Sequence, residues 1–288
     1  MSEPVLARTA SHIRELVESW RASHQSVALV PTMGNLHRGH ASLAELAADS
    51  ADRVVVSIFV NPTQFGPDED YAAYPRTLAE DRALVRETGA VDALFVPEVR
   101  EIYPFGPENA VRLVMPSLSR ELCGAKRPGH FDGVATVVCR LLNIVGPDVL
   151  VLGRKDYQQL ILIERMVADL RLRVQIVSGE TQRHDDGLAI SSRNRYLTES
   201  ERRHAPVLHA TLARVADALK NGERDFASLQ AGAVKALREA GFEPDYVEVR
   251  RAADLTLPNG RQRPEELIVL AAAWLGKARL IDNQRVSR

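Results

Sequence analysis

The stretch SVALVPTMGNLHRGHASLAELA, residues 26–47, decides how the chain folds. It begins with SVALVPT, whose apolar residues do not alternate with polar ones, and this predicts a strand buried on both faces of a parallel sheet. From residue 39 onward the apolar spacing is that of a helix. Gly34, His37, Gly39 and His40 therefore lie where a strand ends and a helix begins, which is where open α/β sheets bind ligands.

The same alternation of buried strands and amphipathic helices continues to about residue 179. Further strands are predicted at 53–60, 93–97, 148–153 and 173–179, and helices at 39–51, 76–89, 132–145 and 157–170. This pattern predicts an α/β fold with a doubly wound parallel sheet, a Rossmann-like domain over residues 1–181.

The pattern changes in the last third of the chain. Long helical segments at 199–221 and 225–240 are followed by short strands at 245–252, 267–275 and 278–283. We therefore expect a smaller α+β domain over residues 182–288.

Composition excludes several classes of protein. Hydrophobic residues make up 45% and charged residues 26% of 288, with a formal charge of -1, so disordered and collagen-like classes do not fit. The sequence contains no run of five or more like charges of the kind that indicates a nucleic-acid surface. It also contains no stretch that approaches the roughly 18 apolar residues of a membrane span. The N-terminal residues lack the apolar segment of an export signal, and the two cysteines, Cys123 and Cys139, suit a reducing cytoplasm. We expect a cytoplasmic protein without nucleic-acid or membrane partners.

The histidines of the opening stretch predict a phosphate site. A helix N-terminus presents unpaired N–H groups and a partial positive charge, and imidazoles placed there add further donors. Gly39 removes a Cβ so that a nucleotide can approach the backbone. The alternative is that surface histidines and capping glycines coincide, but the preceding strand and following helix favour the phosphate site.

Two later segments add phosphate-binding groups. LAISSRNRYLT, residues 188–198, offers the hydroxyls of Ser191 and Ser192 and the guanidinium of Arg193, although a serine-rich linker with a helix cap would look similar. GRKDYQQL, residues 153–160, follows a strand and contains Lys155, one of only five lysines, as a point charge for pyrophosphate. Asp156 fits either a ribose contact or the N-cap of the next helix.

The chain resembles a known family at six ordered motifs. PTMGNLHRGH, SIFVNPTQF, AYPRTLAED, RPGHFDGVATVV, GRKDYQQL and DGLAISSRNRYL occur in the order typical of the pantothenate synthetase (pantoate–β-alanine ligase) family, within the HxGH nucleotidylyltransferase superfamily. The match extends to AAAWLGKARLIDN near the C-terminus. The resemblance implies ATP-dependent ligation of (R)-pantoate and β-alanine through a pantoyl adenylate, giving pantothenate, AMP and pyrophosphate. It also implies Mg²⁺ and a homodimer.

The resemblance assigns roles to individual residues, and His37 falls in the slot of the catalytic proton donor. The implied catalytic residues are His37, His40, Lys155, Ser191, Ser192 and Arg193. The implied ATP-binding residues are Pro31, Thr32, Met33, Gly34, Asn35, Leu36, Arg38, Gly39, Gly153, Arg154, Asp156, Gln182 and Ile190. The implied substrate-binding residues are Gln64, Gln159, Arg127 and His130, and Gln64 also faces β-alanine.

Some positions leave questions open. Arg154 replaces the family's common Glu and adds positive charge near the triphosphate, while Ile190 replaces Met or Leu with similar volume. Glu80 and Asp81 align with a metal-binding pair of some members, but a solvated acidic helix face explains them more simply.

The activity requires charge stabilisation and exclusion of water rather than a protein nucleophile. A carboxylate must first become a mixed anhydride before an amine can displace AMP, so we expect the C-terminal domain to act as a lid over the intermediate. One rival is another nucleotidylyltransferase, which needs cations where this chain has Gln64 and Gln159. A non-catalytic nucleotide-binding regulator is the other, and it predicts the loss of His37, His40 or Lys155, all of which are present.

Overall fold

The computed structural model describes residues 3–66, 71–115 and 117–287, and the chain forms two compact units. The first unit contains Met1–Arg154 and Leu162–Glu180. The second contains Lys155–Ile161 and Thr181–Arg288, so it includes a short segment from the middle of the sequence.

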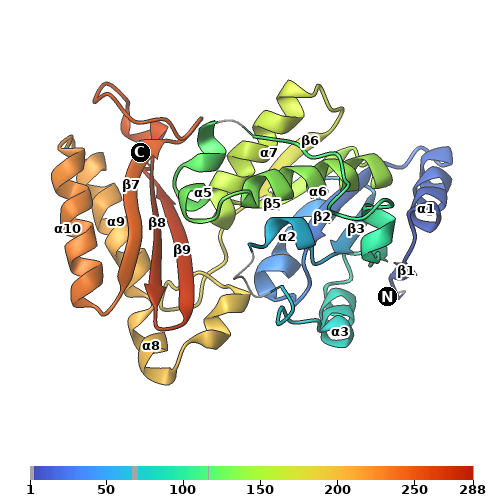
Figure 1. Ribbon diagram of the computed structural model, residues 1–288, viewed down its shortest axis with the longest axis horizontal. Helices are drawn as coiled ribbons and strands as arrows, with labels where there is room; N and C mark the ends of the chain where they lie inside the picture. Colours follow the sequence, from blue (N-terminus) through green and yellow to red (C-terminus); the bar gives the residue numbers. More distant parts are fainter. Residues whose placement is uncertain (1–2, 67–70, 116, 288) are drawn as a thin grey trace. The chain divides into compact units, whose positions relative to one another are not determined.

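The first unit is built on a six-stranded parallel sheet, drawn from blue to yellow in Figure 1. The strand order is β1-β4-β3-β2-β5-β6, which confirms the predicted doubly wound sheet. The five strands predicted from the sequence are all present, within a few residues of their expected ends. The strands are β1 (Val5–Ala7), β2 (Val27–Thr32), β3 (Arg53–Ile58), β4 (Ala93–Phe95), β5 (Val149–Gly153) and β6 (Gln175–Gly179).

The direction of the winding reverses beside β2. From β2 the chain proceeds through β3 to β4 on one side, and it then returns to place β5 and β6 on the other side. Loops that leave β2 and β5 at their carboxyl ends therefore start from neighbouring strands, at the position where such sheets bind ligands.

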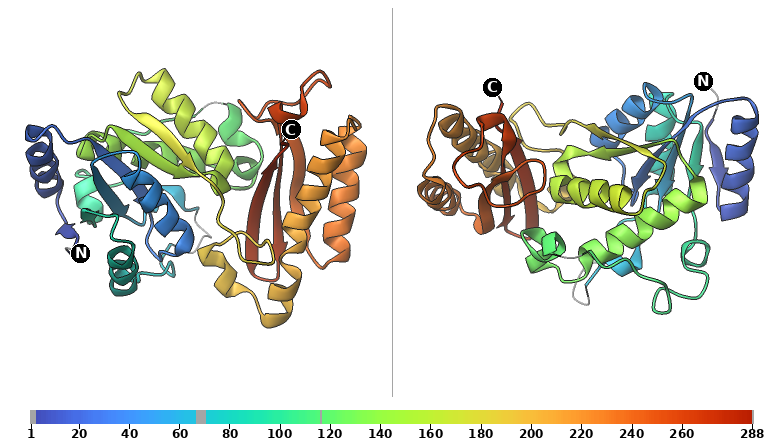
Figure 2. Two further views of the ribbon diagram at one scale, coloured as in Figure 1. Left: turned by 180° about the vertical axis from the view of Figure 1, so that it is seen from behind. Right: turned by 90° about the horizontal axis from the view of Figure 1, so that it is seen from above.

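Helices cover both faces of this sheet (Figures 1 and 2). Helices α2 (Arg38–Ala48) and α3 (Leu78–Thr88) pack together over a core that includes Val30 and Val56, whereas α1 (Ala10–Ala22) and α6 (His130–Val145) pack together on the other face. The short helices α4 (Val99–Ile102) and α5 (Cys123–Lys126) belong to the connection before α6.

The N-terminal elements were absent from the sequence-based prediction. Strand β1 pairs in parallel with β4 at the sheet edge, and Thr9 caps α1 by accepting a hydrogen bond from the backbone N–H of His12 at 3.2 Å. A strand of three residues is too short to show a periodicity, which explains the omission.

The second unit contains an antiparallel sheet of β7 (Glu243–Arg251), β8 (Leu267–Leu275) and β9 (Ala278–Arg285). Helices α9 (Val207–Lys220) and α10 (Phe226–Glu239) pack against this sheet. The single helix predicted over 199–221 is wrong, because α8 (Glu199–His204) ends before Pro206 and α9 follows it. Proline lacks the N–H group and clashes with the preceding turn, so it separates the two helices.

Helix α7 (Tyr157–Asp169) begins in the second unit and continues in the first. Within the described residues, no helix combines the length and the apolar character needed to cross a membrane.

Candidate active site

The loop after β2 is shaped by two residues with positive φ. Gly34 has a φ of +80°, and a Cβ added there would lie 3.0 Å from Ile58 Cγ2 and 3.1 Å from Asp81 Oδ2. The next residue, Asn35, has a φ of 51°, a conformation that asparagine tolerates better than most residues. The backbone N–H of Gly34 donates to the hydroxyl of Thr32 at 3.2 Å, so this hydroxyl serves the loop itself.

Asp81 on α3 holds the loop from behind. Its side chain is only 2% exposed, and its carboxylate accepts hydrogen bonds from the backbone N–H groups of Asn35 at 3.0 Å and Leu36 at 2.6 Å. The hydroxyl of Thr77 donates to it at 3.2 Å. The solvated-face interpretation of Asp81 is therefore wrong, although Glu80 is exposed. The two amides of the loop are directed at this carboxylate and are not available to a phosphate.

His37 and His40 form the N-terminal cap of α2. The backbone N–H of Gly39 donates to His37 Nδ1 at 3.2 Å, and the N–H of His37 donates to His40 Nδ1 at 3.3 Å. A neutral imidazole that accepts at Nδ1 carries its proton on Nε2. The rings are stacked with centroids 4.1 Å apart. The cap therefore makes both imidazoles Nε2–H donors at the helix N-terminus, which suits contact with phosphate oxygens.

Gln64 follows β3 in the short η1 helix (Pro62–Gln64), and its amide has a fixed orientation. Its Oε1 accepts from Asn61 Nδ2 at 3.1 Å, and its Nε2 donates to Met33 Sδ at 3.0 Å. Asn61 is 1% exposed and is itself held by the hydroxyl of Tyr103, which donates to Asn61 Oδ1 at 2.7 Å. The amide donor of Gln64 thus points toward the loop after β2.

His130 joins Gln64 to Arg127 at the start of α6. His130 Nδ1 lies 2.8 Å from the carbonyl oxygen of Gln64, and a carbonyl only accepts, so Nδ1 carries the proton. His130 Nε2 then accepts from the Arg127 guanidinium at 2.9 Å. Helix α6 comes this close because residue 133 is glycine: a Cβ there would lie 2.3 Å from the carbonyl oxygen of Thr63. Three of the predicted substrate-binding residues are therefore in contact within the first unit.

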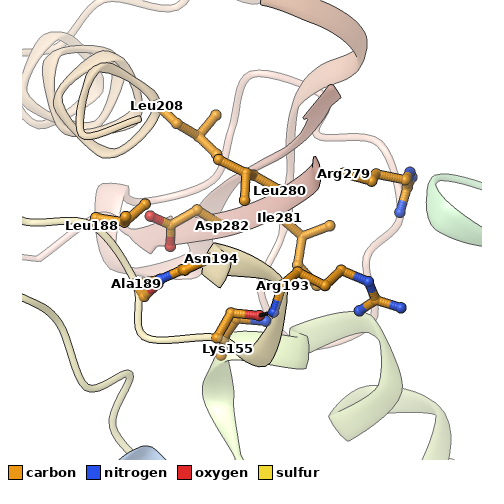
Figure 3. A pocket seen from close by; sticks show the side chains of 11 residues that line it. Lys155, Leu188, Ala189, Arg193, Asn194, Leu208, Arg279, Leu280, Ile281 and Asp282 are labelled. Atoms are coloured by element: carbon orange, nitrogen blue, oxygen red, sulfur yellow. Dashed lines mark hydrogen bonds between the residues drawn. The ribbon is translucent and has the colours of Figure 1, made fainter. Parts of the chain in front are cut away.

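A second group of predicted residues lines a pocket in the second unit, shown in Figure 3. Lys155, Ser191 and Arg193 line it together with Asn194 and Asp282. Ser191 caps the short η4 helix (Ser192–Tyr196) by accepting from the backbone N–H of Arg193 at 3.3 Å. The ammonium of Lys155, the hydroxyl of Ser191 and the guanidinium of Arg193 thus lie around one hollow, and groups of these kinds can bind phosphate oxygens.

Comparisons with known proteins give the family. A sequence model of the family described as Pantoate-beta-alanine ligase matches residues 5–285. The chain belongs to the pantoate–beta-alanine ligase family. It is 54% identical over 279 residues to pantothenate synthetase from Nitrosococcus oceani, covering 97% of this chain and 96% of that protein.

Solved structures of the family agree with the fold. Pantothenate synthetase from Thermus thermophilus matches with a TM-score of 0.90 at 42% identity, covering 99% of this chain and all of the other. Pantoate–beta-alanine ligase from Francisella tularensis, solved with β,γ-ATP and β-alanine, matches with a TM-score of 0.81 at 35% identity over 98% of both chains. The predicted activity as a pantoate–β-alanine ligase is confirmed by this membership.

The remaining predicted residues of this ligase are distributed over both units. Gly153 ends β5 and Arg154 opens the η3 helix (Arg154–Asp156). The Arg154 guanidinium donates to Ser178 Oγ at 2.9 Å and pairs with Glu180, so its charge is balanced within the first unit. Arg38 is exposed at the first turn of α2, and Gln159 lies in the first turn of α7. The backbone N–H of Ile190 donates to the carbonyl of Gln182 at 2.9 Å.

The part of the chain that the structure describes contains no cluster of three or more His, Cys, Asp or Glu side chains suited to a metal ion. Both oxygens of Asp81 already accept hydrogen bonds, and Glu80 is exposed beside it. This pair therefore does not form a prearranged magnesium site, which needs several oxygen ligands around the ion.

Several buried polar residues that hold predicted site residues in place have no signal in the sequence pattern. Asn61 stands within the quoted NPTQ segment, but only its contacts with Gln64 and Tyr103 reveal its role. Asp282 and Asn283 likewise stand in the C-terminal motif, where the local pattern does not reveal that both are buried.

Proposed function

We propose that the chain activates (R)-pantoate with ATP to pantoyl adenylate and then transfers the pantoyl group to β-alanine, giving pantothenate, AMP and pyrophosphate. The observation that carries this proposal is the capped pair of His37 and His40 at the reversal point of the parallel sheet. The side-chain amide of Gln64, whose Nε2 faces the loop after β2 in the same unit, adds a neutral donor suited to a hydroxy acid.

The reaction proceeds in two steps whose bonds balance. A pantoate carboxylate oxygen attacks the α-phosphorus of ATP, and the bond to the bridging oxygen of pyrophosphate breaks. The amine of β-alanine then attacks the acyl carbon, loses a proton, and AMP departs. The protein aligns the reactants and stabilises the charge that develops on phosphate oxygens.

The proposed chemistry gives a role to each predicted residue. We propose that His37 and His40 donate from Nε2 to the phosphates, with His37 as proton donor, and that Lys155 stabilises the leaving pyrophosphate. Ser191, Ser192 and Arg193 hold phosphate oxygens. Gln64, Gln159, Arg127 and His130 bind pantoate, and Gln64 also contacts β-alanine. The proposed nucleotide contacts are Pro31, Thr32, Met33, Gly34, Asn35, Leu36, Arg38, Gly39, Gly153, Arg154, Asp156, Gln182 and Ile190.

Mg²⁺ enters as the complex with ATP in this proposal. Phosphate oxygens and water would supply its ligands, as is common for magnesium, so few protein ligands are needed. Glu80 is the exposed acidic side chain that could approach such a complex, since Asp81 is committed to the loop.

We propose a cytoplasmic homodimer whose second unit closes as a lid over the adenylate. Phe105, Val111 and Val114, which lie within ten residues of one another in the sequence, are 80%, 82% and 66% exposed, and an interface between two copies would bury such apolar side chains. Sedimentation of a Val114→Glu variant as a monomer would support this interface, and an unchanged dimer would contradict it.

Isotope exchange tests the two-step reaction. With ATP, Mg²⁺ and pantoate but without β-alanine, labelled pyrophosphate should enter ATP, and omission of pantoate should abolish the exchange. A mononucleotide adenylyltransferase would ignore pantoate, and a nucleotide-binding regulator would exchange nothing. Lack of pantoate-dependent exchange in enzyme that still makes pantothenate would refute a reversible adenylate.

A further inference from the structure

Strand β9 carries two consecutive buried polar residues. Asp282 is 4% exposed and Asn283 is 8% exposed, although neighbouring residues of a strand point to opposite faces. Burial of a carboxylate and an amide is costly unless both are hydrogen-bonded, so their partners indicate what these residues do.

Asp282 fixes the segment that leads to the serine loop. It forms a bidentate ion pair with Arg183, with N–O distances of 2.7 and 2.9 Å. Arg183 opens a hairpin in which it pairs with Ala189. The side-chain amide of Asn194 in turn donates to the carbonyl of Ala189 at 3.0 Å. A planar guanidinium held at both nitrogens sets position as well as charge, so this pair anchors the hairpin and η4 to β9.

Asn283 fixes the lysine loop. Its Nδ2 donates to the backbone carbonyl of Lys155 at 3.0 Å. The Lys155 side chain is 18% exposed, and its Nζ lies 3.8 Å from Asp156 Oδ2. Because the hydrogen bond holds the backbone of Lys155 itself, it limits where the ammonium group can lie.

Both anchored segments line the same pocket, as Figure 3 shows for Lys155, Arg193 and Asp282. One strand therefore holds, through adjacent residues, the two segments that carry Lys155 and Ser191–Arg193. A displacement of about 1 Å in such groups can lower a rate about 100-fold, because charge stabilisation depends on their placement.

We propose that Asp282 and Asn283 are positioning residues for adenylate formation, Asp282 acting through Arg183 on the serine loop and Asn283 acting through the Lys155 backbone. This inference rests on the proposed function, in which Lys155 and Ser191–Arg193 stabilise the phosphates. It assigns to both residues a role that is exerted through Arg183 and through the Lys155 backbone.

The two half-reactions separate positioning from general stability. Adenylate formation releases pyrophosphate and needs Lys155, whereas attack of β-alanine on preformed adenylate does not involve pyrophosphate. Asn283→Asp replaces the N–H donor with an oxygen that faces the Lys155 carbonyl. We expect single-turnover adenylate formation to fall about 10- to 100-fold, with the second half-reaction within about threefold of the parent protein.

The control is Asn143→Asp. Asn143 is exposed on α6 and also donates its Nδ2 to a backbone carbonyl, that of Cys139, at 2.8 Å. The control should leave both half-reactions unchanged. Equal slowing of both half-reactions by Asn283→Asp would show a merely structural role and overturn the proposal, and Asn283→Ala gives the same comparison if the first variant does not fold.

Double variants test the route of the effect. In a Lys155→Ala background, Asn283→Asp should slow adenylate formation by less than about twofold more, because residues acting through one another are not additive. Asp282→Asn should likewise lose its effect in an Arg193→Ala background. If Asp282→Asn does not fold, Arg183→Lys takes its place, because lysine keeps the positive charge but cannot form the bidentate pair. If the effects of the two substitutions in a pair on the rate of adenylate formation are fully additive, the route proposed for that pair is refuted. If Lys155→Ala alone leaves adenylate formation unchanged, the proposed function of Lys155 fails instead.

Discussion

Asp81→Asn should loosen the loop that carries the histidine pair. The carboxylate of Asp81 accepts from two backbone N–H groups and one hydroxyl in a site where it is 2% exposed. Asparagine retains one acceptor oxygen, so one buried donor faces an NH₂ group, which costs about 1–3 kcal/mol. The other bonds also lose the strength of a charged acceptor. We therefore expect the free energy of unfolding of the first unit to fall by about 2–4 kcal/mol.

The variant should still fold, because domains are typically stable by about 5–15 kcal/mol. The chain has two tryptophans, buried Trp20 in α1 and the 39% exposed Trp274 in β8. In a Trp274→Phe background, urea unfolding followed by fluorescence reports Trp20 and hence the first unit. Adenylate formation in the folded protein should fall about 100-fold, because the histidine cap is displaced with the loop.

Glu80→Gln is the matched control. It makes the same charge change at the neighbouring residue of α3, where the side chain is exposed, and it should alter stability by no more than about 0.5 kcal/mol. If Asp81→Asn unfolds at the same urea concentration as the control and forms adenylate at the parental rate, Asp81 does not hold the loop. A raised requirement for Mg²⁺ in Glu80→Gln would indicate contact with the metal complex.

Three other substitutions have defined outcomes. Gly133→Ala should destabilise the first unit and impair use of pantoate, since its Cβ would lie 2.3 Å from a backbone carbonyl oxygen, whereas Gly232→Ala on α10, with nothing within 4 Å, should be neutral or stabilising in urea unfolding. Burial, with a smaller contribution from the charge of Arg183, lowers the pKa of His209 below 6.5, so the unfolded state binds more protons. The free energy of unfolding should therefore rise with pH between that lowered pKa and 6.5, and urea titrations of His209→Gln across this range should lack that part of the slope. Gln64→Ala should raise the KM for pantoate while calorimetry finds ATP binding unchanged; a loss mainly in ATP affinity would contradict the assignment.

The sheet could be predicted because its strands are buried on both faces. Segments such as 53–60 and 148–153 consist mainly of β-branched residues and leucine, and a parallel sheet covered by helices on both sides keeps both faces of such strands from water. The histidine pair could be placed because a motif between a strand and a helix has only one position relative to a parallel sheet. Its cap geometry could not be predicted, since the choice between Nδ1 and Nε2 depends on the local hydrogen bonds.

Neighbouring acids illustrate what the sequence leaves undetermined. Glu80 and Asp81 are chemically alike and adjacent in the first turn of α3, yet one is exposed and the other is buried against the loop after β2. Helical periodicity separates their directions by about 100°, but the loop that receives Asp81 comes from residues more than 40 positions earlier. A tertiary contact of this kind has no signature in local spacing.

The GRKD segment contains neighbouring residues, Arg154 and Lys155, that are held by different parts of the structure. Arg154 is held by Ser178 of β6 and by Glu180 just after it in the first unit, whereas the backbone of Lys155 is held by Asn283 in the second. Two consecutive residues are thus held by partners in different units. The charge of Arg154 is matched by Glu180 and its side chain is held by Ser178, so an arginine is accommodated at this position. The same tolerance does not extend to residue 155, because the proposed role of Lys155 depends on a charge held in place from a different strand.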